Sequence, residues 1–342
     1  MERKIKNIFL LFLIAFICSC SKNTNIDSNA LVEEKTFFSN NDSYVNDNSF
    51  SSFYSLDSSS SENAYGKSID YNWLDLAHYE GYEFVASIGG QDGCSYGDYL
   101  FSFNSDNTFV VYNLAKSIVV GQYVLDGEFF PHCNTACFGR EKFSYDDLFP
   151  LVYVNAYNNL DLPRGRCYAF RIFGNEIDGF KTQLVQTITL DFTYDHLWAF
   201  GNDEIRPYGN FVVDVTKMKL YAYTMMNSIE RTRFFEFDLP RINDGENIIL
   251  GKKDILKYFD TYYLDIIQGN FHSNGKIILC YGLGGSTSGI AVIDVGLEAI
   301  VSDFSLISIG IYEEPEKVFE YNGDLFFGSL ENLYRIFFLT TN

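Results

Sequence analysis

The chain has 342 residues, a formal net charge of −20 and an aromatic content of 18%, with 33 Phe and 25 Tyr. This negative charge argues against a nucleic-acid partner, which needs basic surface to meet phosphate, and against electrostatic attachment to anionic lipid. The aromatic content fits β-structure, in which aromatic side chains pack on half-buried faces. A stacking surface for sugars is the alternative, but most of the aromatic residues lie in alternating, strand-like runs.

The first twenty residues resemble a bacterial lipoprotein signal. A positively charged start precedes an apolar run at residues 8–17, and Ile17-Cys18-Ser19-Cys20 then resembles a lipobox. The run is too short for a membrane-spanning helix, which needs about twenty residues. The resemblance implies that residues 1–19 are a cleaved signal peptide and that acylation of Cys20 anchors the protein to a membrane. An ordinary secretory signal is the alternative.

Residues 20–70 are expected to form a disordered tether after the lipidated cysteine. The segment is rich in Ser, Asn and Asp and has no sustained hydrophobic period. Such a composition cannot bury enough apolar surface to offset the loss of chain entropy. A flexible tether of this kind would let a folded domain, expected at residues 71–342, stand away from the membrane.

Residues 71–342 are expected to be all-β, because short runs of Val, Ile, Phe and Tyr alternate with turn residues. Weakly repeated three-strand units indicate a β-propeller of five or more blades, within a range of five to seven. The apolar runs that open the units are Tyr99–Phe103, Phe149–Val154, Asn210–Val215, Lys276–Tyr281 and Asp324–Gly328. Residues 82–88 could supply an outer strand to the last unit and so close the ring. A further blade could lie between Arg241 and Phe271, and a β-sandwich is the alternative fold.

Several short motifs carry a resemblance to a protein family. They are Pro131-His132-Cys133-Asn134, Phe138-Gly139, Asp147-Leu148-Phe149-Pro150-Leu151-Val152-Tyr153-Val154 and Arg166-Cys167-Tyr168. This stretch resembles uncharacterised propeller-like lipoproteins of gut Bacteroidales, often described as TolB-like. The resemblance supports the propeller fold and a place in the cell envelope, as an outer-membrane lipoprotein that faces the periplasm or the cell surface. It implies no specific activity.

The cysteines after the lipobox suggest neither a metal site nor a cofactor. Five remain, so an exported chain could pair some of them and would leave at least one unpaired. His132-Cys133-x-x-x-Cys137 has metal-like spacing, but a zinc site needs a second pair of ligands and none stands nearby. Cys133 and Cys137 could instead form a local disulfide or simply pack in the core. No metal and no cofactor are therefore expected.

The candidate ligand-binding residues precede the expected opening strands. His132, His196 and His272 could converge where loops enter a propeller's central channel, or each could satisfy its own turn. Arg206 and Tyr208, in a loop with Pro207, offer a guanidinium for a carboxylate and a phenol ring for a sugar. A purely structural turn explains this pair equally well. The acidic pairs Asp146-Asp147 and Glu313-Glu314 are expected to be solvated loop charges.

No strong catalytic motif is present in the sequence, and no catalytic residue can be named from it. The favoured function is a lipid-anchored, non-catalytic binding module for a glycan, a peptide or a partner protein of the envelope. The alternative is a polysaccharide-degrading lyase or hydrolase with His, Tyr and Arg groups at the channel. A structural component of an envelope complex is a third hypothesis. Whether the protein is an enzyme stays open, although a non-catalytic binding protein is favoured.

Overall fold

The computed structural model describes residues 69–127, 133–155, 165–199, 209–285 and 287–339. The chain divides into two compact units, Met1–Phe50 and Ser51–Asn342, and every described residue belongs to the second. Across these described stretches, no helix has both the length and the apolar character needed to cross a membrane. The predicted signal, tether and domain boundary at residue 71 stay predictions.

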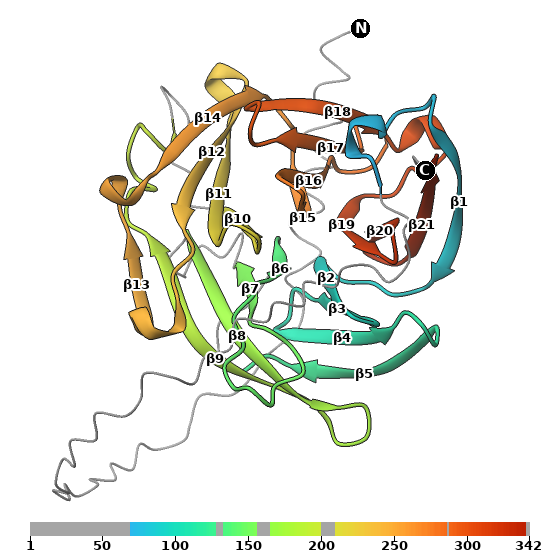
Figure 1. Ribbon diagram of the computed structural model, residues 1–342. Helices are drawn as coiled ribbons and strands as arrows, with labels where there is room; N and C mark the ends of the chain where they lie inside the picture. Colours follow the sequence, from blue (N-terminus) through green and yellow to red (C-terminus); the bar gives the residue numbers. More distant parts are fainter. Residues whose placement is uncertain (1–68, 128–132, 156–164, 200–208, 286, 340–342) are drawn as a thin grey trace, which may run out of the picture. The chain divides into compact units, whose positions relative to one another are not determined.

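Five sheets surround a common axis, so the described part of the second unit is a five-bladed β-propeller (Figure 1). Neighbouring strands are antiparallel except for β13, which pairs parallel with β9. We number the blades from the first inner strand: blade 1 is β2-β3-β4-β5, blade 2 is β6-β7-β8-β9 with β13 added, blade 3 is β10-β11-β12-β14, blade 4 is β15-β16-β17-β18, and blade 5 is β19-β20-β21-β1. The strands are β1 Tyr79–Ala86, β2 Asp92–Tyr96, β3 Tyr99–Phe103, β4 Thr108–Asn113, β5 Ile118–Val124, β6 Ala136–Phe138, β7 Val152–Asn155, β8 Arg166–Asn175, β9 Gly179–Leu190, β10 Asn210–Asp214, β11 Lys219–Met226, β12 Arg231–Asp238, β13 Asn247–Leu250, β14 Lys257–Tyr262, β15 Ile267–Ser273, β16 Lys276–Tyr281, β17 Gly289–Asp294, β18 Ala299–Ser305, β19 Pro315–Tyr321, β20 Asp324–Ser329 and β21 Leu333–Phe338.

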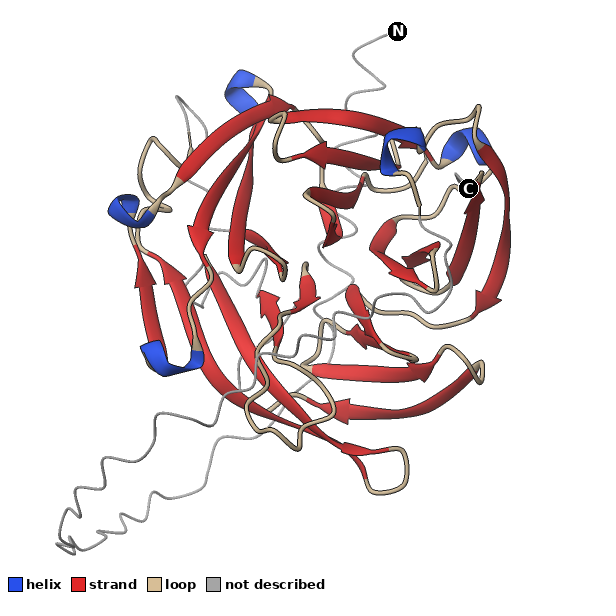
Figure 2. Cartoon of the chain, in the orientation of Figure 1, coloured by secondary structure: helices blue, strands red, loops and turns tan. Residues whose placement is uncertain are grey.

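Helical structure in the described residues is confined to short 3₁₀ turns in the connections between strands (Figure 2). These turns are η1 Tyr71–Trp73, η2 Asn227–Ile229, η3 Ile242–Asp244, η4 Lys252–Asp254 and η5 Ile307–Ile309. A turn of three residues can redirect the chain but has no length over which to pack an amphipathic face. The core is therefore built by the sheets alone.

Two Asn-Gly turns join an innermost strand to the second strand of its blade. Asn274 and Gly275 have φ values of 50° and 78° between β15 and β16, and Asn322 and Gly323 have 51° and 74° between β19 and β20. Two-residue hairpins favour turns in which both central residues have positive φ, and Asn-Gly tolerates this conformation best. These four residues fix where the inner strands of blades 4 and 5 end.

Blade 5 is completed by the first strand of the propeller. β1 pairs antiparallel with β21, with Tyr79 opposite Phe338 and Tyr82 opposite Ile336. This pairing confirms the prediction that residues 82–88 lend an outer strand to the last unit, although β1 spans Tyr79–Ala86. The ring is thus closed by hydrogen bonds between distant parts of the chain.

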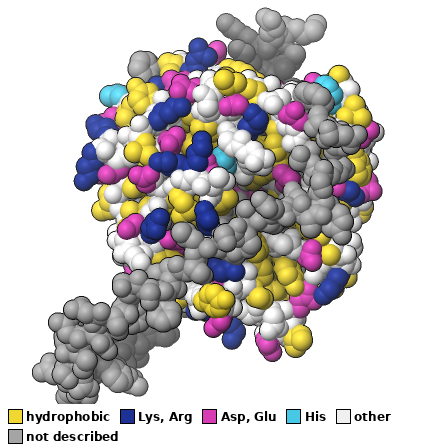
Figure 3. Space-filling model, in the orientation of Figure 1, with side chains coloured by type: hydrophobic (Ala, Val, Ile, Leu, Met, Phe, Trp, Pro, Cys, Tyr) yellow, Lys and Arg dark blue, Asp and Glu magenta, His cyan; other side chains and the backbone are white. Residues whose placement is uncertain are grey.

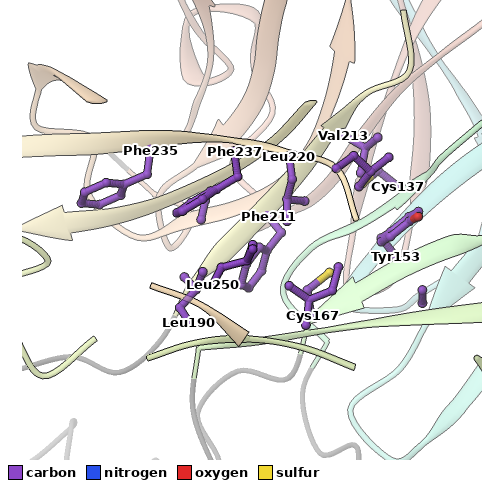
Figure 4. Packing of buried hydrophobic residues seen from close by; sticks show 14 of the residues in the cluster. Cys137, Tyr153, Cys167, Leu190, Phe211, Val213, Leu220, Phe235, Phe237 and Leu250 are labelled. Atoms are coloured by element: carbon purple, nitrogen blue, oxygen red, sulfur yellow. The ribbon is translucent and has the colours of Figure 1, made fainter. Parts of the chain in front are cut away.

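The core lies between neighbouring blades, where the facing sides of two sheets meet. Between blades 2 and 3, one cluster of buried side chains includes Cys167, Phe211, Phe235 and Leu250 (Figure 4). Trp198 is fully buried there and stacks on Phe235 with ring centroids 5.3 Å apart. The aromatic residues of the chain therefore serve largely as β-sheet packing, and each blade is held by its two neighbours.

Two details of the predicted repeat are wrong. Four of the five expected opening runs are second strands rather than innermost ones; only Asn210–Val215 matches an innermost strand, β10. The segment between Arg241 and Phe271 holds no further blade. It supplies β13 to the edge of blade 2, the outer strand β14 to blade 3 and most of β15 to blade 4. The propeller is confirmed, and the β-sandwich alternative is not.

Candidate functional site

The innermost strands carry an unusual number of buried polar side chains near their first residues. Asp92, Asn270 and Lys317 are all fully buried, and Gln268 and Glu316 are 6% and 3% exposed. They lie on β2, β15 and β19, which border the axis together with β6 and β10 (Figure 1). Buried polar groups must find partners, because an unmet hydrogen bond in a protein interior costs about 1–3 kcal/mol.

Side-chain hydrogen bonds join successive blades around the axis. Asp92 of blade 1 accepts a bond from the backbone N–H of Ala136 in blade 2. Thr135 Oγ1 accepts from the N–H of Phe211 in blade 3 at 3.2 Å, and Asn270 Nδ2 of blade 4 donates to the carbonyl of Phe211 at 3.1 Å. The innermost strands belong to separate sheets and do not pair with one another. Side-chain hydrogen bonds therefore join them in place of backbone hydrogen bonds between strands.

The remaining two links complete the circuit. Gln268 Nε2 of blade 4 donates to Glu314 Oε1, in the connection that leads into blade 5, at 3.0 Å. Lys317 Nζ of blade 5 donates to the carbonyl of Gly90, just before blade 1, at 3.0 Å, and to that of Ser329 at 3.3 Å. We call this circuit, from Asp92 through Lys317, the axial polar network. It occupies the end of the ring at which the innermost strands begin.

Burial perturbs the ionisable groups of the network. Burial raises the pKa of Asp92 well above its ordinary value, although bonds from the Gly93 and Ala136 N–H groups oppose it. Burial, and then the nearby Glu314, raises the pKa of Glu316 to about 9. Burial lowers the pKa of Lys317 to about 8, against the attraction of the neighbouring carboxyl groups. Such perturbed groups cluster at functional sites more often than elsewhere, so this end of the ring is the first candidate.

An open pocket lies at the outer part of the same end. It has a volume of about 650 Å³ and is lined by Glu230, Arg231, Tyr262, Tyr263 and Asp265. These residues come from the β11–β12 connection and from the β14–β15 connection, which runs directly into the inner strand of blade 4. We call it the rim pocket.

The side chains of the rim pocket are held in different ways. The Tyr262 hydroxyl donates to Asp303 Oδ2 at 2.9 Å, and the Tyr263 hydroxyl donates to Asp265 Oδ1 at 3.0 Å. Burial and the Asp303 carboxylate raise the pKa of Tyr262, so this phenol stays a hydrogen-bond donor. Arg231 pairs backbone to backbone with Tyr262, and its guanidinium forms no ion pair within the described part of the chain.

The backbone on both sides of the rim pocket is strained. Glu230 and Ile266 have φ values of 51° and 50°, in the left-handed region that side chains other than glycine seldom adopt. A β-branched residue such as isoleucine is particularly disfavoured there. Strain of this kind persists only where the surrounding structure holds it, so the pocket walls are preorganised.

The structure places two of the predicted site residues and does not bring them together. His196 lies on an exposed turn between β9 and β10. His272 lies on β15 with its side chain 2% exposed; its Nε2 is 3.4 Å from Asp214 Oδ2, and its ring stacks on Tyr221. Burial lowers the pKa of His272, although Asp214 favours the charged form. Cys20, His132, Arg206 and Tyr208 lie outside the described residues, so their ligand and lipidation roles stay predictions.

The described cysteines pack in the core, which was one of the two alternatives for Cys133 and Cys137. All five cysteines in the described part of the chain are free and buried: Cys94, Cys133, Cys137, Cys167 and Cys280. Within the described stretches, no three His, Cys, Asp or Glu side chains are placed to hold a metal ion.

The prediction that both acidic pairs are solvated is wrong for three of their members. Asp147 is buried, and its carboxylate receives Arg171 Nη2 at 2.7 Å. Glu313 accepts bonds from the hydroxyls of Ser329 and Tyr334, and Glu314 belongs to the axial polar network. In each case a donor from a different strand draws the carboxylate inward, and sequence spacing does not reveal such a donor.

Sequence reasoning missed the axial residues because it missed their strands. One signal was available: Asn274-Gly275 and Asn322-Gly323 are typical of two-residue hairpins, which require a strand before them as well as after. That requirement predicts β15 and β19, and with them Gln268 and Glu316. No comparable signal marks Asp92.

Comparison with known proteins finds similarity to solved structures. The crystal structure of Myxococcus xanthus glutaminyl cyclase is similar to this chain with a TM-score of 0.45 and 12% sequence identity, over 78% of this chain and 97% of that chain. No family model and no curated protein sequence matches the chain. The propeller assignment rests on the sheet order described above, and a functional assignment must rest on the chain's own residues.

Proposed function

We propose that this propeller is a non-catalytic binding module that takes a neutral glycan in the rim pocket. The observation that carries the proposal is the pocket itself: an open hollow of about 650 Å³ with two tyrosines, an arginine and two carboxylates on its walls. Pockets that bind small ligands combine aromatic surface with a few polar groups that set orientation. The rim pocket has both.

The chemistry of the lining favours a sugar. The C–H groups of a sugar ring carry partial positive charge and pack on the electron-rich face of a tyrosine such as Tyr263. Arg231, Glu230 and Asp265 provide planar donors and acceptors that match vicinal hydroxyl groups. Arg231 can turn toward a ligand without breaking an ion pair within the described residues.

The charge of the protein favours a neutral sugar over an acidic one. The net charge of −20 disfavours the approach of an anionic polymer. On the face drawn in Figure 3, basic side chains are interspersed with acidic ones. Two of the five pocket residues are themselves acids, which would repel a uronic acid or a sulfated sugar.

We further propose that the signal-like segment holds this module at the cell envelope through acylated Cys20. A lipid anchor with a tether of about fifty residues gives a binding module reach without diffusion away from the membrane. Weak sites gain effective affinity when both partners are confined to one surface. A modest affinity for a single glycan chain would then suffice.

The test is a titration of the purified full chain against a library of neutral and acidic oligosaccharides. We expect a neutral oligosaccharide to bind, and Tyr263→Ala or Arg231→Ala to weaken binding about tenfold or more, equivalent to about 1.4 kcal/mol. Tyr145→Ala is the matched control, because Tyr145 is 75% exposed in the β6–β7 connection, away from the pocket.

Three results would contradict the proposal. Binding that Tyr145→Ala and Tyr263→Ala reduce equally would place the glycan elsewhere. Release of shortened or unsaturated products from the bound oligosaccharide would identify a hydrolase or lyase instead of a binder. If only peptides or an envelope protein bind, the glycan assignment fails.

A further inference from the structure

The carboxyl group of Glu316 has no hydrogen-bond partner among the residues that the structure describes. Glu316 is the second residue of β19 and is 3% exposed, and its side chain accepts and donates no hydrogen bond among the described residues. Glutamate is rarely buried so deeply unless it is paired. All of the other charged residues of the axial polar network have such a partner, so Glu316 is the exception that requires an explanation.

Three innermost strands meet beside the backbone of Glu316. A Cβ atom added to Gly269 of β15 would lie 2.3 Å from Asp92 Oδ1, 2.5 Å from the Glu316 carbonyl oxygen and 2.7 Å from Lys317 Cα. Only a glycine leaves room for β2 and β19 to approach β15 so closely. The backbone of Glu316 is therefore held closely against β15.

The groups that face Glu316 form an acceptor-rich surrounding. Its charged neighbours are Glu314 in the η5–β19 connection, Lys317 on β19 and Asp92 on β2. Lys317 already donates to two backbone carbonyls, and Asp92 already accepts from two backbone N–H groups. What remains available is the Glu316 carboxyl, the half-buried Glu314 carboxyl and the carbonyl of Gln268, whose amide nitrogen is bonded to Glu314. When both carboxyl groups are ionised, all three groups only accept hydrogen bonds, and the described residues of the axial polar network leave no donor to serve them.

We propose that Glu316, with Glu314 and Gln268, binds a nitrogen cation that carries at least two N–H donors, such as the ammonium or guanidinium group of a peptide. Such a group would supply the missing donors and would offset the repulsion between the two carboxylates. The site is separate from the rim pocket, since its residues come from blade 4 and the start of blade 5. The half-buried Glu314 gives the ligand its approach, and the acidic charge of the protein attracts cations.

Binding at this site is linked to the release of a proton. In the free protein the Glu316 carboxyl has its pKa raised to about 9 and holds its proton at neutral pH. The carboxyl must lose this proton to solvent before it can pair with a cation. At pH values below this pKa of about 9, each increase of one pH unit therefore raises the observed affinity about tenfold. Between pH 6 and pH 8 the affinity rises about 90-fold.

The experiment is calorimetric titration of the purified full chain at pH 6, 7 and 8 with capped amino-acid probes. N-acetylarginine methylamide presents a guanidinium, N-acetyllysine methylamide presents an ammonium on a side chain, and alanine methylamide presents a terminal ammonium. N-acetylcitrulline methylamide is the neutral counterpart of the arginine probe. We expect at least one cationic probe to bind more tightly at higher pH and the citrulline probe to bind at least tenfold more weakly. The cationic probe that binds best identifies the source of the group.

The matched variants are Glu316→Gln and Glu80→Gln. Glutamine has the shape of the protonated carboxyl, so Glu316→Gln should fold normally but lose both the affinity and its pH dependence. Glu80 is exposed on β1, and its replacement should change neither. Tyr263→Ala should also leave cation binding intact, so a failure of the glycan proposal is recognised separately. The proposal is overturned if no cationic probe binds, if the citrulline probe binds equally, or if Glu316→Gln keeps the wild-type affinity and pH profile.

Discussion

Replacement of Glu316 by glutamine should stabilise the propeller at neutral pH. The folded protein keeps the Glu316 carboxyl protonated up to a pKa of about 9, whereas the unfolded chain ionises it near the ordinary value of 4.5. Between these two values the folded state holds one more proton than the unfolded state, so the free energy of unfolding falls as pH rises. Glutamine does not titrate, and the variant escapes this loss.

The expected gain in the free energy of unfolding follows from how far the pH lies above the pKa of Glu316 in the unfolded chain. A pH of 7 lies about 2.5 units above the pKa of this carboxyl group in the unfolded chain. Each of these units lowers the free energy of unfolding by about 1.4 kcal/mol. Glu316→Gln should therefore raise the free energy of unfolding by about 3 kcal/mol at pH 7. At pH 4 the carboxyl is mostly protonated in both states, and the difference should nearly vanish.

Urea unfolding at pH 4 and pH 7, followed by tryptophan fluorescence and circular dichroism, measures both values. Glu80→Gln is the control, because Glu80 is exposed on β1 and its replacement should change the free energy of unfolding by less than about 0.5 kcal/mol. The reasoning is refuted if Glu316→Gln leaves the stability at pH 7 unchanged. A gain of equal size at both pH values would also refute it, since it would arise from packing rather than from ionisation.

Two further predictions concern the interior. Gly269→Ala should cost about 3 kcal/mol, because the new Cβ would lie 2.3–2.7 Å from atoms of β2 and β19; an unchanged urea midpoint would contradict the close approach of the three strands. The five described cysteines should react with a thiol reagent at pH 8 only after unfolding, because burial raises their thiol pKa values and removes them from solvent. Rapid labelling of any of these thiols in the native protein, mapped by peptide mass analysis, would count against this.

The parts of the fold that sequence predicts well are the middle and outer strands. Runs such as Tyr99–Phe103 are rich in large apolar residues that pack between blades. Their sequence pattern therefore predicts directly that they are buried strands. The closing strand was also predictable, because a unit with one strand too few implies a strand elsewhere. Blade count was less certain, since the stretch between Arg241 and Phe271 contains strands that extend existing blades.

Four of the five innermost strands escaped prediction, and β2 and β15 show a physical reason. Near the axis there is little room, so β2 and β15 carry small and polar residues such as Gly93, Gly269 and Asn270 in place of an apolar run. Their stability comes from bonds to the next blade, which depend on residues far away in the chain. The candidate site lies on these strands, and for that reason its residues could not be identified from spacing alone.

The pairing of β1 with β21 also constrains how the protein is made. Tyr79 pairs with Phe338, so this pair forms only after roughly 260 further residues have been synthesised. Until then β1 has an unpaired edge, and blade 5 has no outer strand. Contacts so distant in sequence form slowly and late in folding. The ring of the incomplete chain thus stays open while the chain grows, and it can close only after Phe338 has been made.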